Sequence, residues 1–104
     1  MSDSDLNTFI HQLPKAELHV HLEGAIAPGT VLELAQRHKM QDTLPAQNEA
    51  DLQKWFTFTD FDHFVGIYVT IQNLLRTPED FALITYRLGE DMARQNIRYR
   101  EATF

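Results

Sequence analysis

The chain contains no cysteine, which excludes disulfide bonds and thiolate metal sites and is typical of a reducing compartment. Its first residues, Met1 to Asp5, are acidic and polar and lack the basic and apolar regions of a secretory signal peptide. No apolar run approaches the length that crosses a membrane. Internal repeats and low-complexity tracts are also absent. We therefore expect a soluble, cytoplasmic protein that has no membrane partner.

Positive charge is scarce, because the Lys and Arg total of 9 stands against an Asp and Glu total of 15, giving a formal net charge of −6. Nucleic-acid binding needs a basic surface, so this balance argues against a nucleic-acid partner. Apolar residues make up 43% of the chain, as in ordinary folded proteins, and 104 residues are enough for one small domain.

Helix and strand signals follow one another along the chain. The expected elements are a helix over 5–12, a strand over 16–22, a helix over 30–38, a loop over 39–48, a helix over 49–56, a helix from 60 onward, a helix from 78 to about 94 and a strand over 97–104. Asn48 and Thr77 are expected to cap helices, and Asp80 is expected in a first turn on a solvated face.

Two of these helices carry apolar residues at three- and four-residue steps, which predicts a buried stripe on each. The first stripe comprises Phe61, Phe64, Val65, Tyr68, Ile71, Leu74 and Leu75. The second comprises Phe81, Ile84, Leu88 and Met92.

The order strand, helices, strand predicts a parallel pair, because such a crossover returns the chain in the same direction. Parallel sheets are normally covered on both faces, whereas the last expected strand ends at Phe104 with no helix behind it. We therefore expect residues 1–104 to be the opening third or so of a larger α/β barrel.

The strand over 16–22 carries the functional signal, since alternate side chains of a strand point to opposite faces. One face would carry Leu18, Val20 and Leu22, and the other Glu17, His19, His21 and Glu23. Two imidazoles one residue apart on one face can converge on a single metal ion, and neutral imidazole suits zinc. The alternative is an edge strand whose polar face lies in water. Glu17 could orient a histidine or form a structural ion pair.

The motif around this strand resembles the adenosine/adenine deaminase family of metal-dependent amidohydrolases. It reads Pro14-Lys15-Ala16-Glu17-Leu18-His19-Val20-His21-Leu22-Glu23-Gly24-Ala25. The segment from Tyr99 to Phe104 is similar to the second barrel strand of the family. The resemblance implies a (β/α)8 barrel with its site at the C-terminal ends of the strands, one amidohydrolase domain of which residues 1–104 form the N-terminal segment.

The same resemblance implies one zinc ion and hydrolytic deamination at C6 of a 6-aminopurine nucleoside, converting adenosine to inosine and ammonia. His19 and His21 would be metal ligands, and His21, Glu23 and Gly24 would lie at the substrate, with Glu23 near the ribose hydroxyls. The remaining ligands and the catalytic acid would come from beyond residue 104, so no catalytic residue is assigned here and the segment alone is expected to be inactive.

Phe58 and Phe61 fall where the family places an apolar lid over the purine, although burial in a plain core is the alternative for both. His63 is more readily explained as a solvated helical residue than as a third ligand. Two other substrates are compatible with the resemblance: adenine, or a modified adenosine such as aminodeoxyfutalosine. A hypothesis of another class is a non-catalytic metal-binding or interaction fragment. The oligomeric state is not predicted.

Overall fold

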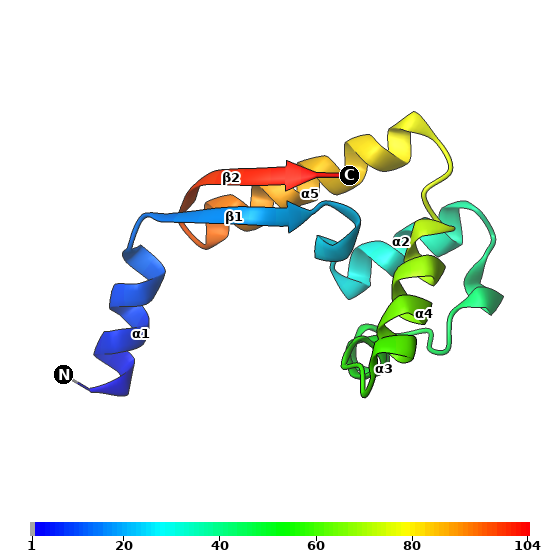
Figure 1. Ribbon diagram of the computed structural model, residues 1–104, viewed down its shortest axis with the longest axis horizontal. Helices are drawn as coiled ribbons and strands as arrows, with labels where there is room; N and C mark the ends of the chain where they lie inside the picture. Colours follow the sequence, from blue (N-terminus) through cyan, green and yellow to red (C-terminus); the bar gives the residue numbers. More distant parts are fainter. Residues whose placement is uncertain (1) are drawn as a thin grey trace.

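The computed structural model describes residues 2–104, and it has an elongated shape that measures 47 × 29 × 24 Å (Figure 1). The helices are α1 (Asp3–Gln12), α2 (Pro28–Arg37), α3 (Glu49–Phe56), α4 (Phe61–Gln72) and α5 (Pro78–Arg94). The strands are β1 (Lys15–His21) and β2 (Ile97–Thr103), and single 3-10 turns are η1 (Glu23–Ala25) and η2 (Gln41–Thr43). Each expected element is present with ends that differ by a few residues. No helix within residues 2–104 is long and apolar enough to cross a membrane.

Local capping determines where the central helices begin. The side chains of Asn48, Asp60 and Thr77 each accept a hydrogen bond from the backbone N–H three residues further on. Such a bond satisfies one of the N–H groups that the first turn of a helix leaves without a partner. Thr77 and Asp80 also form a reciprocal capping box at the start of α5. The predicted caps at Asn48 and Thr77 are therefore confirmed.

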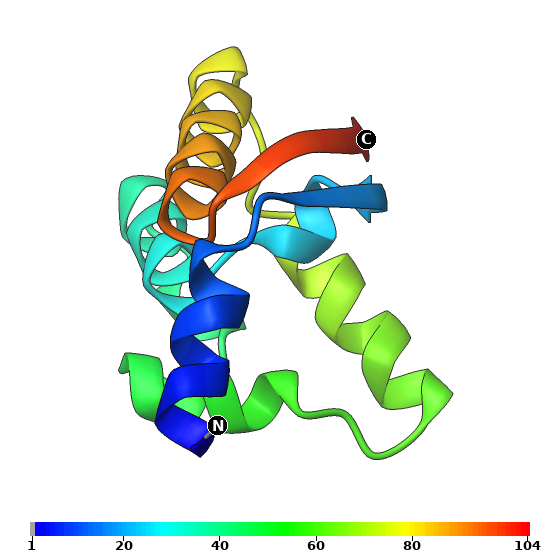
Figure 2. The ribbon, with the colours of Figure 1, turned by 90° about the vertical axis from the view of Figure 1, so that its left-hand side faces the viewer.

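The two strands pair in parallel, as predicted, and α5 leads back along them into β2. Figure 1 shows α2, α3 and α4 beyond the C-terminal ends of the strands and α1 at the N-terminal end of β1. Figure 2, viewed from the α1 end, shows α1 extending away from the two strands. The hydrophobic core lies among α2, α3, α4, α5 and η1, where Val31, Leu34, Leu52 and Leu74 are fully buried. The helical segment between the strands thus forms a compact body at the end of the sheet where β1 delivers its histidines.

The predicted stripe on α4 was partly wrong. Ile67, Ile71 and Leu74 are the buried residues, whereas Phe61 is 74% exposed and Phe64 is also exposed. The helix packs on η1 and α3 through its Ile67–Ile71 face, so its aromatic face is left open beside the C-terminal end of β1. On α5, the buried residues Ile84 and Leu88 agree with the prediction, whereas Phe81 is exposed.

The strict alternation predicted for β1 was also wrong at one position. Val20 and Leu22 are buried, but Leu18 is 65% exposed. Between the pairs Glu17–Arg100 and Val20–Ala102, β1 has two residues and β2 has one. This is the geometry of a β-bulge, which breaks the period-two pattern. Leu18 therefore does not share the buried environment of Val20.

Asp80 is fully buried, so its expected place on a solvated face was wrong, although its capping role was correct. Its Oδ1 accepts from Arg37 Nη1 at 2.8 Å, and its Oδ2 lies 2.6 Å from His38 Nε2. Oδ2 also accepts from the backbone N–H groups of Arg76 and Thr77 at 2.9 and 3.0 Å. The carboxylate therefore joins the end of α2 to the start of α5.

Electrostatics keep that carboxylate charged. Burial by itself would raise the pKa of Asp80, but the hydrogen bonds from the Arg76 N–H, His38, Arg37 and the Thr77 N–H outweigh it. Together they hold the pKa of Asp80 far below the ordinary range of a carboxyl group. Asp80 is thus an ionised link in the core, remote in sequence from the histidine motif.

Candidate active site

His19 and His21 lie side by side at the C-terminal end of β1. Their ring centroids are 5.0 Å apart and the rings meet nearly edge to face, at 85°. Both line a cavity of about 550 Å³, together with residues of η1, α4, α5 and β2. The predicted convergence of the two imidazoles on one concavity is therefore present in the structure. Their assignment as metal ligands stays a prediction.

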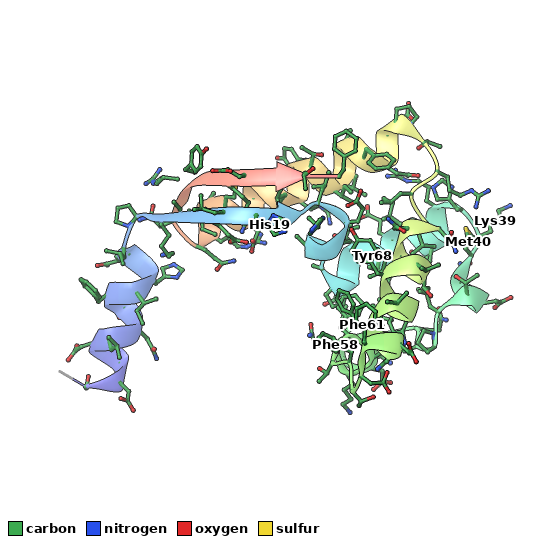
Figure 3. The ribbon with its side chains drawn as sticks, viewed as in Figure 1. His19, Lys39, Met40, Phe58, Phe61 and Tyr68 are labelled. Carbon is green, nitrogen blue, oxygen red and sulfur yellow. The ribbon has the colours of Figure 1, made fainter. Side chains whose placement is uncertain are left out.

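The backbone at His19 is unusual because its φ is +68°, in the left-handed region that non-glycine residues rarely adopt. His19 belongs to the bulge, where the extra residue of β1 has no partner on β2. Strained residues of this kind cost of order 1–3 kcal/mol and cluster at functional sites, where they aim a side chain. The bulge thus includes the residue whose ring lies 5.0 Å from that of His21. Figure 3 labels His19 on β1.

The two histidines are ligands of a type that zinc prefers, but two ligands are too few for a complete zinc site. Imidazole nitrogens are preferred zinc ligands, and catalytic zinc usually has at least three protein ligands. Within residues 2–104, no group of three or more His, Asp or Glu side chains is arranged to hold a metal ion. His63, the other histidine considered, accepts a hydrogen bond from the Thr59 N–H at 3.2 Å through its Nδ1.

A buried guanidinium forms another part of the same cavity wall. Arg100 is only 5% exposed, and its Nη2 lies 2.8 Å from Glu17 Oε2 and 3.4 Å from Asp91 Oδ2. Its Nε and Nη1 have no hydrogen-bond partner among the described residues. Of the two roles considered for Glu17, the structure contains the ion pair. No hydrogen bond joins Glu17 to either histidine within residues 2–104.

Glu23 is 7% exposed and sits in η1 immediately after the strand. Its Oε2 accepts a hydrogen bond from the hydroxyl of Tyr68 in α4 at 3.2 Å. Burial raises the pKa of Tyr68, and the negative charge of Glu23 and the hydrogen bond to it add to that rise. Tyr68 is therefore a neutral donor to Glu23 at neutral pH. Glu23 does not itself line the cavity, whereas Tyr68 does.

Gly24 separates His21 from Tyr68. A Cβ at position 24 would stand 3.7 Å from the Cβ of His21 and 3.6 Å from Cε2 of Tyr68, which is ordinary van der Waals contact. Gly24 lines both the 550 Å³ cavity and a smaller one of about 180 Å³. A side chain here would therefore fill space between the histidine motif and α4, so glycine keeps that space open.

Phe58 lies in the loop just before α4, and Phe61 is the first residue of that helix (Figure 3). Phe58 is half exposed and packs edge-on against Phe64 at 5.0 Å between ring centroids. It lines the 180 Å³ cavity with Gly24 and Tyr68. Phe61 stacks on Phe64 at 6.2 Å and is not one of the residues that line this cavity. Burial in a plain core was thus wrong for both residues, and only Phe58 borders the site.

Tyr68 is the site residue that sequence reasoning missed. It was assigned to an apolar stripe because its position fits the helical period of Phe64 and Ile71. The available signal was its hydroxyl, the one polar group in that stripe, because a half-buried phenol needs a hydrogen-bond partner. The partner is 45 residues away in sequence, so the pairing could not be read from local pattern.

Comparison with known proteins identifies the same motif. Residues 14–104 match the family model described as Adenosine deaminase. The chain is 52% identical over 99 residues to the aminodeoxyfutalosine deaminase of Streptomyces coelicolor, and 37% identical over 99 residues to the adenine deaminase of Crocosphaera subtropica. These matches cover 95% of this chain but 25% and 30% of the relatives, so the chain spans about a quarter of their length.

Solved structures give the same result for the fold. The adenine deaminase from Arthrobacter aurescens superposes with a TM-score of 0.73 and 32% identity, covering 86% of this chain and 27% of that one. The N6-mAMP deaminase of arabidopsis gives a TM-score of 0.71 and 29% identity over 91% of this chain and 28% of that one. The predicted fold class, the first part of a (β/α)8 barrel, is confirmed by these matches.

Proposed function

Because the chain belongs to the adenosine deaminase family, we propose that the full-length protein removes the amino group from C6 of a purine by hydrolysis. The relatives favour the alternative substrate over adenosine, since two that are 52% and 50% identical are aminodeoxyfutalosine deaminases. The proposed substrate is therefore a modified adenosine of this type. Water supplies the oxygen that replaces the amino group, and ammonia leaves.

The observation that carries the proposal is the pair of imidazoles at the cavity end of β1. His19 and His21 would hold one zinc ion, with further ligands from outside residues 2–104. A bound zinc ion lowers the pKa of water to about 7, which makes hydroxide available near neutral pH. The bulge at His19 would hold its ring in place. One ring nitrogen of His19 and one of His21 would then bind the same ion without a change in side-chain conformation.

The remaining residues would bind and orient the purine nucleoside. Gly24 would allow the ligand close to the backbone, and Glu23 would lie beneath the sugar. Phe58 would cover the apolar face of the base and exclude water, as part of an aromatic group with Phe64. Phe61 would contribute only if α4 or its preceding loop closed over the ligand, because its ring now faces solvent.

The test is a comparison of three substrates with the purified, zinc-loaded, full-length protein. Deamination of aminodeoxyfutalosine, adenosine and adenine would be followed by ultraviolet absorbance and by ammonia release. We expect kcat/KM to be highest for aminodeoxyfutalosine. A folded, metal-loaded protein that deaminates none of the three would refute the proposal.

A second candidate function is adenine deamination, and a specific observation favours it. Adenine deaminases recur among the relatives at 33–38% identity, and the solved adenine deaminase of Arthrobacter aurescens superposes on this chain with a TM-score of 0.73. In the same assay, this candidate requires a kcat/KM for adenine that exceeds the values for both nucleosides. The two functions are thus separated by one set of measurements.

A further inference from the structure

Tyr68 lies at the junction of three adjoining cavities. It lines the cavity of about 550 Å³ beside both histidines, one of about 340 Å³ beside His21, and one of about 180 Å³ beside Gly24. Glu23 lines none of these three, although it is the hydrogen-bond partner of Tyr68. A ligand in this space would therefore contact the Tyr68 side chain before the carboxylate.

The hydrogen bond to Glu23 determines what the phenol can offer to a ligand. Tyr68 has a single hydroxyl hydrogen, and it is donated to Glu23 Oε2 at 3.2 Å. Its oxygen then has only acceptor capacity left, and donation to a carboxylate strengthens that capacity through polarisation. Glu23, when ionised, is also an acceptor. The pair is therefore complementary to a ligand group that donates a hydrogen bond.

Charge narrows the class of ligand further. A phosphate beside Tyr68 would bring negative charge toward Glu23. Arg100 lines only the 550 Å³ cavity of the three, where its Nη2 is paired with Glu17 and Asp91 and its Nε and Nη1 have no partner among the described residues. In a purine nucleoside the ring nitrogens are acceptors, so they do not complement an acceptor pair. Its donors are the 6-amino group, which would lie at the histidines under the proposed function, and the sugar hydroxyls. Sugar hydroxyls are uncharged donors. The pair of acceptors therefore suits a sugar hydroxyl of a nucleoside better than a phosphate group.

We infer that Tyr68 is a specificity-determining residue: held by Glu23, its oxygen accepts a hydrogen bond from a sugar hydroxyl of a purine nucleoside. This inference rests on the proposed deaminase function of the same site. Its ring forms the apolar wall next to Phe64, at 6.3 Å between centroids, so one side chain contacts both the base-covering aromatic group and the sugar.

The experiment measures kcat and KM separately for wild type and Tyr68→Phe in the zinc-loaded, full-length protein. The substrates are aminodeoxyfutalosine, adenosine, adenine and AMP. The lost bond is made in the ground state and the transition state alike, so KM for the nucleosides should rise about tenfold with kcat within about twofold. The kcat/KM for adenine should change less than about twofold. Tyr86→Phe removes the hydroxyl of an exposed tyrosine on α5 and is the matched control, with unchanged constants.

Equal losses for nucleosides and adenine, or a fall in kcat at unchanged KM, would overturn the inference, as would a wild-type preference for adenine or AMP. If Tyr68→Phe does not fold, Glu23→Gln is the second variant, because its amide oxygen still accepts from Tyr68. It should keep the nucleoside preference over adenine and reduce the discrimination against AMP. Loss of the nucleoside preference in this variant would also overturn the inference. Absence of deamination in the wild type refutes the proposed function instead.

Discussion

Replacing Asp80 by alanine should destabilise the protein far more than a normal helix cap does. The change removes a fully buried carboxylate that binds Arg37, His38 and the N–H groups of Arg76 and Thr77. Removal of one member of a buried ionic group costs about 3–5 kcal/mol, because the remaining polar groups stay buried without partners. We expect a loss near the lower end of this range, because the Arg37 side chain is 38% exposed and water can solvate it after the change.

The matched control for this prediction is Asp60→Ala. Asp60 also caps a helix, accepting from the His63 N–H at 2.8 Å, but it is exposed to solvent. Loss of such a cap costs about 1 kcal/mol. The free energies of unfolding would be measured by urea denaturation of the full-length variants, followed by circular dichroism. Equal losses for Asp60→Ala and Asp80→Ala would show that burial of the Asp80 network adds nothing, contrary to the reasoning.

The lowered pKa of Asp80 also predicts how the free energy of unfolding depends on pH. Because the folded pKa of Asp80 is lowered, its contribution is fully present above the unfolded carboxyl pKa of about 3.9. It is lost as pH falls through the folded value, since the unfolded state then binds the proton first. The part of the stability difference between wild type and Asp80→Ala that comes from this carboxylate should thus still be present at pH 5 and should shrink below about pH 4. A difference that has vanished at pH 5 would contradict this assignment.

Three other predictions follow from the site. His19→Ala should lose most of the bound zinc, as measured by elemental mass spectrometry, whereas His11→Ala on α1 should keep it. Phe58→Ala should raise KM for the purine substrate more than Phe61→Ala does, since only Phe58 lines the cavity. Arg100→Ala should lower the free energy of unfolding by about 2 kcal/mol, less than for a fully buried pair, because its carboxylate partners are partly exposed.

Each of these has a clear contrary result. Wild-type zinc content in His19→Ala would refute the ligand assignment. An equal rise in KM for Phe58→Ala and Phe61→Ala would mean that Phe58 does not cover the purine more closely than Phe61 does. No change in the urea midpoint of Arg100→Ala would mean that its ion pairs contribute nothing to stability.

Features that depend on neighbouring residues could be predicted from the sequence. The caps at Asn48 and Thr77 act on an N–H three residues away, so a short pattern contains the whole interaction. The parallel pairing of the strands also followed from element order alone. The histidine pair was found because one residue of separation keeps two side chains close in almost any extended backbone.

Features that depend on distant partners could not be predicted. The bulge at His19 exists only in relation to β2, more than 75 residues later in the chain. Burial of Asp80 depends on Arg37 and His38, which the fold brings from α2. The exposed position of Phe61 depends on which face of α4 meets the core, and a period of 3.6 alone fits two adjacent faces of this helix.

Tyr68 comes from a helix, whereas the two histidines come from a strand, and this division has an evolutionary consequence. Under the proposed function, the strand would carry the chemistry common to the family, and the helical segment would determine which purine enters. Substitutions in α4 could then redirect selectivity while the reaction itself is preserved. That separation offers an explanation for relatives that match this same chain and yet bear the names of different deaminases.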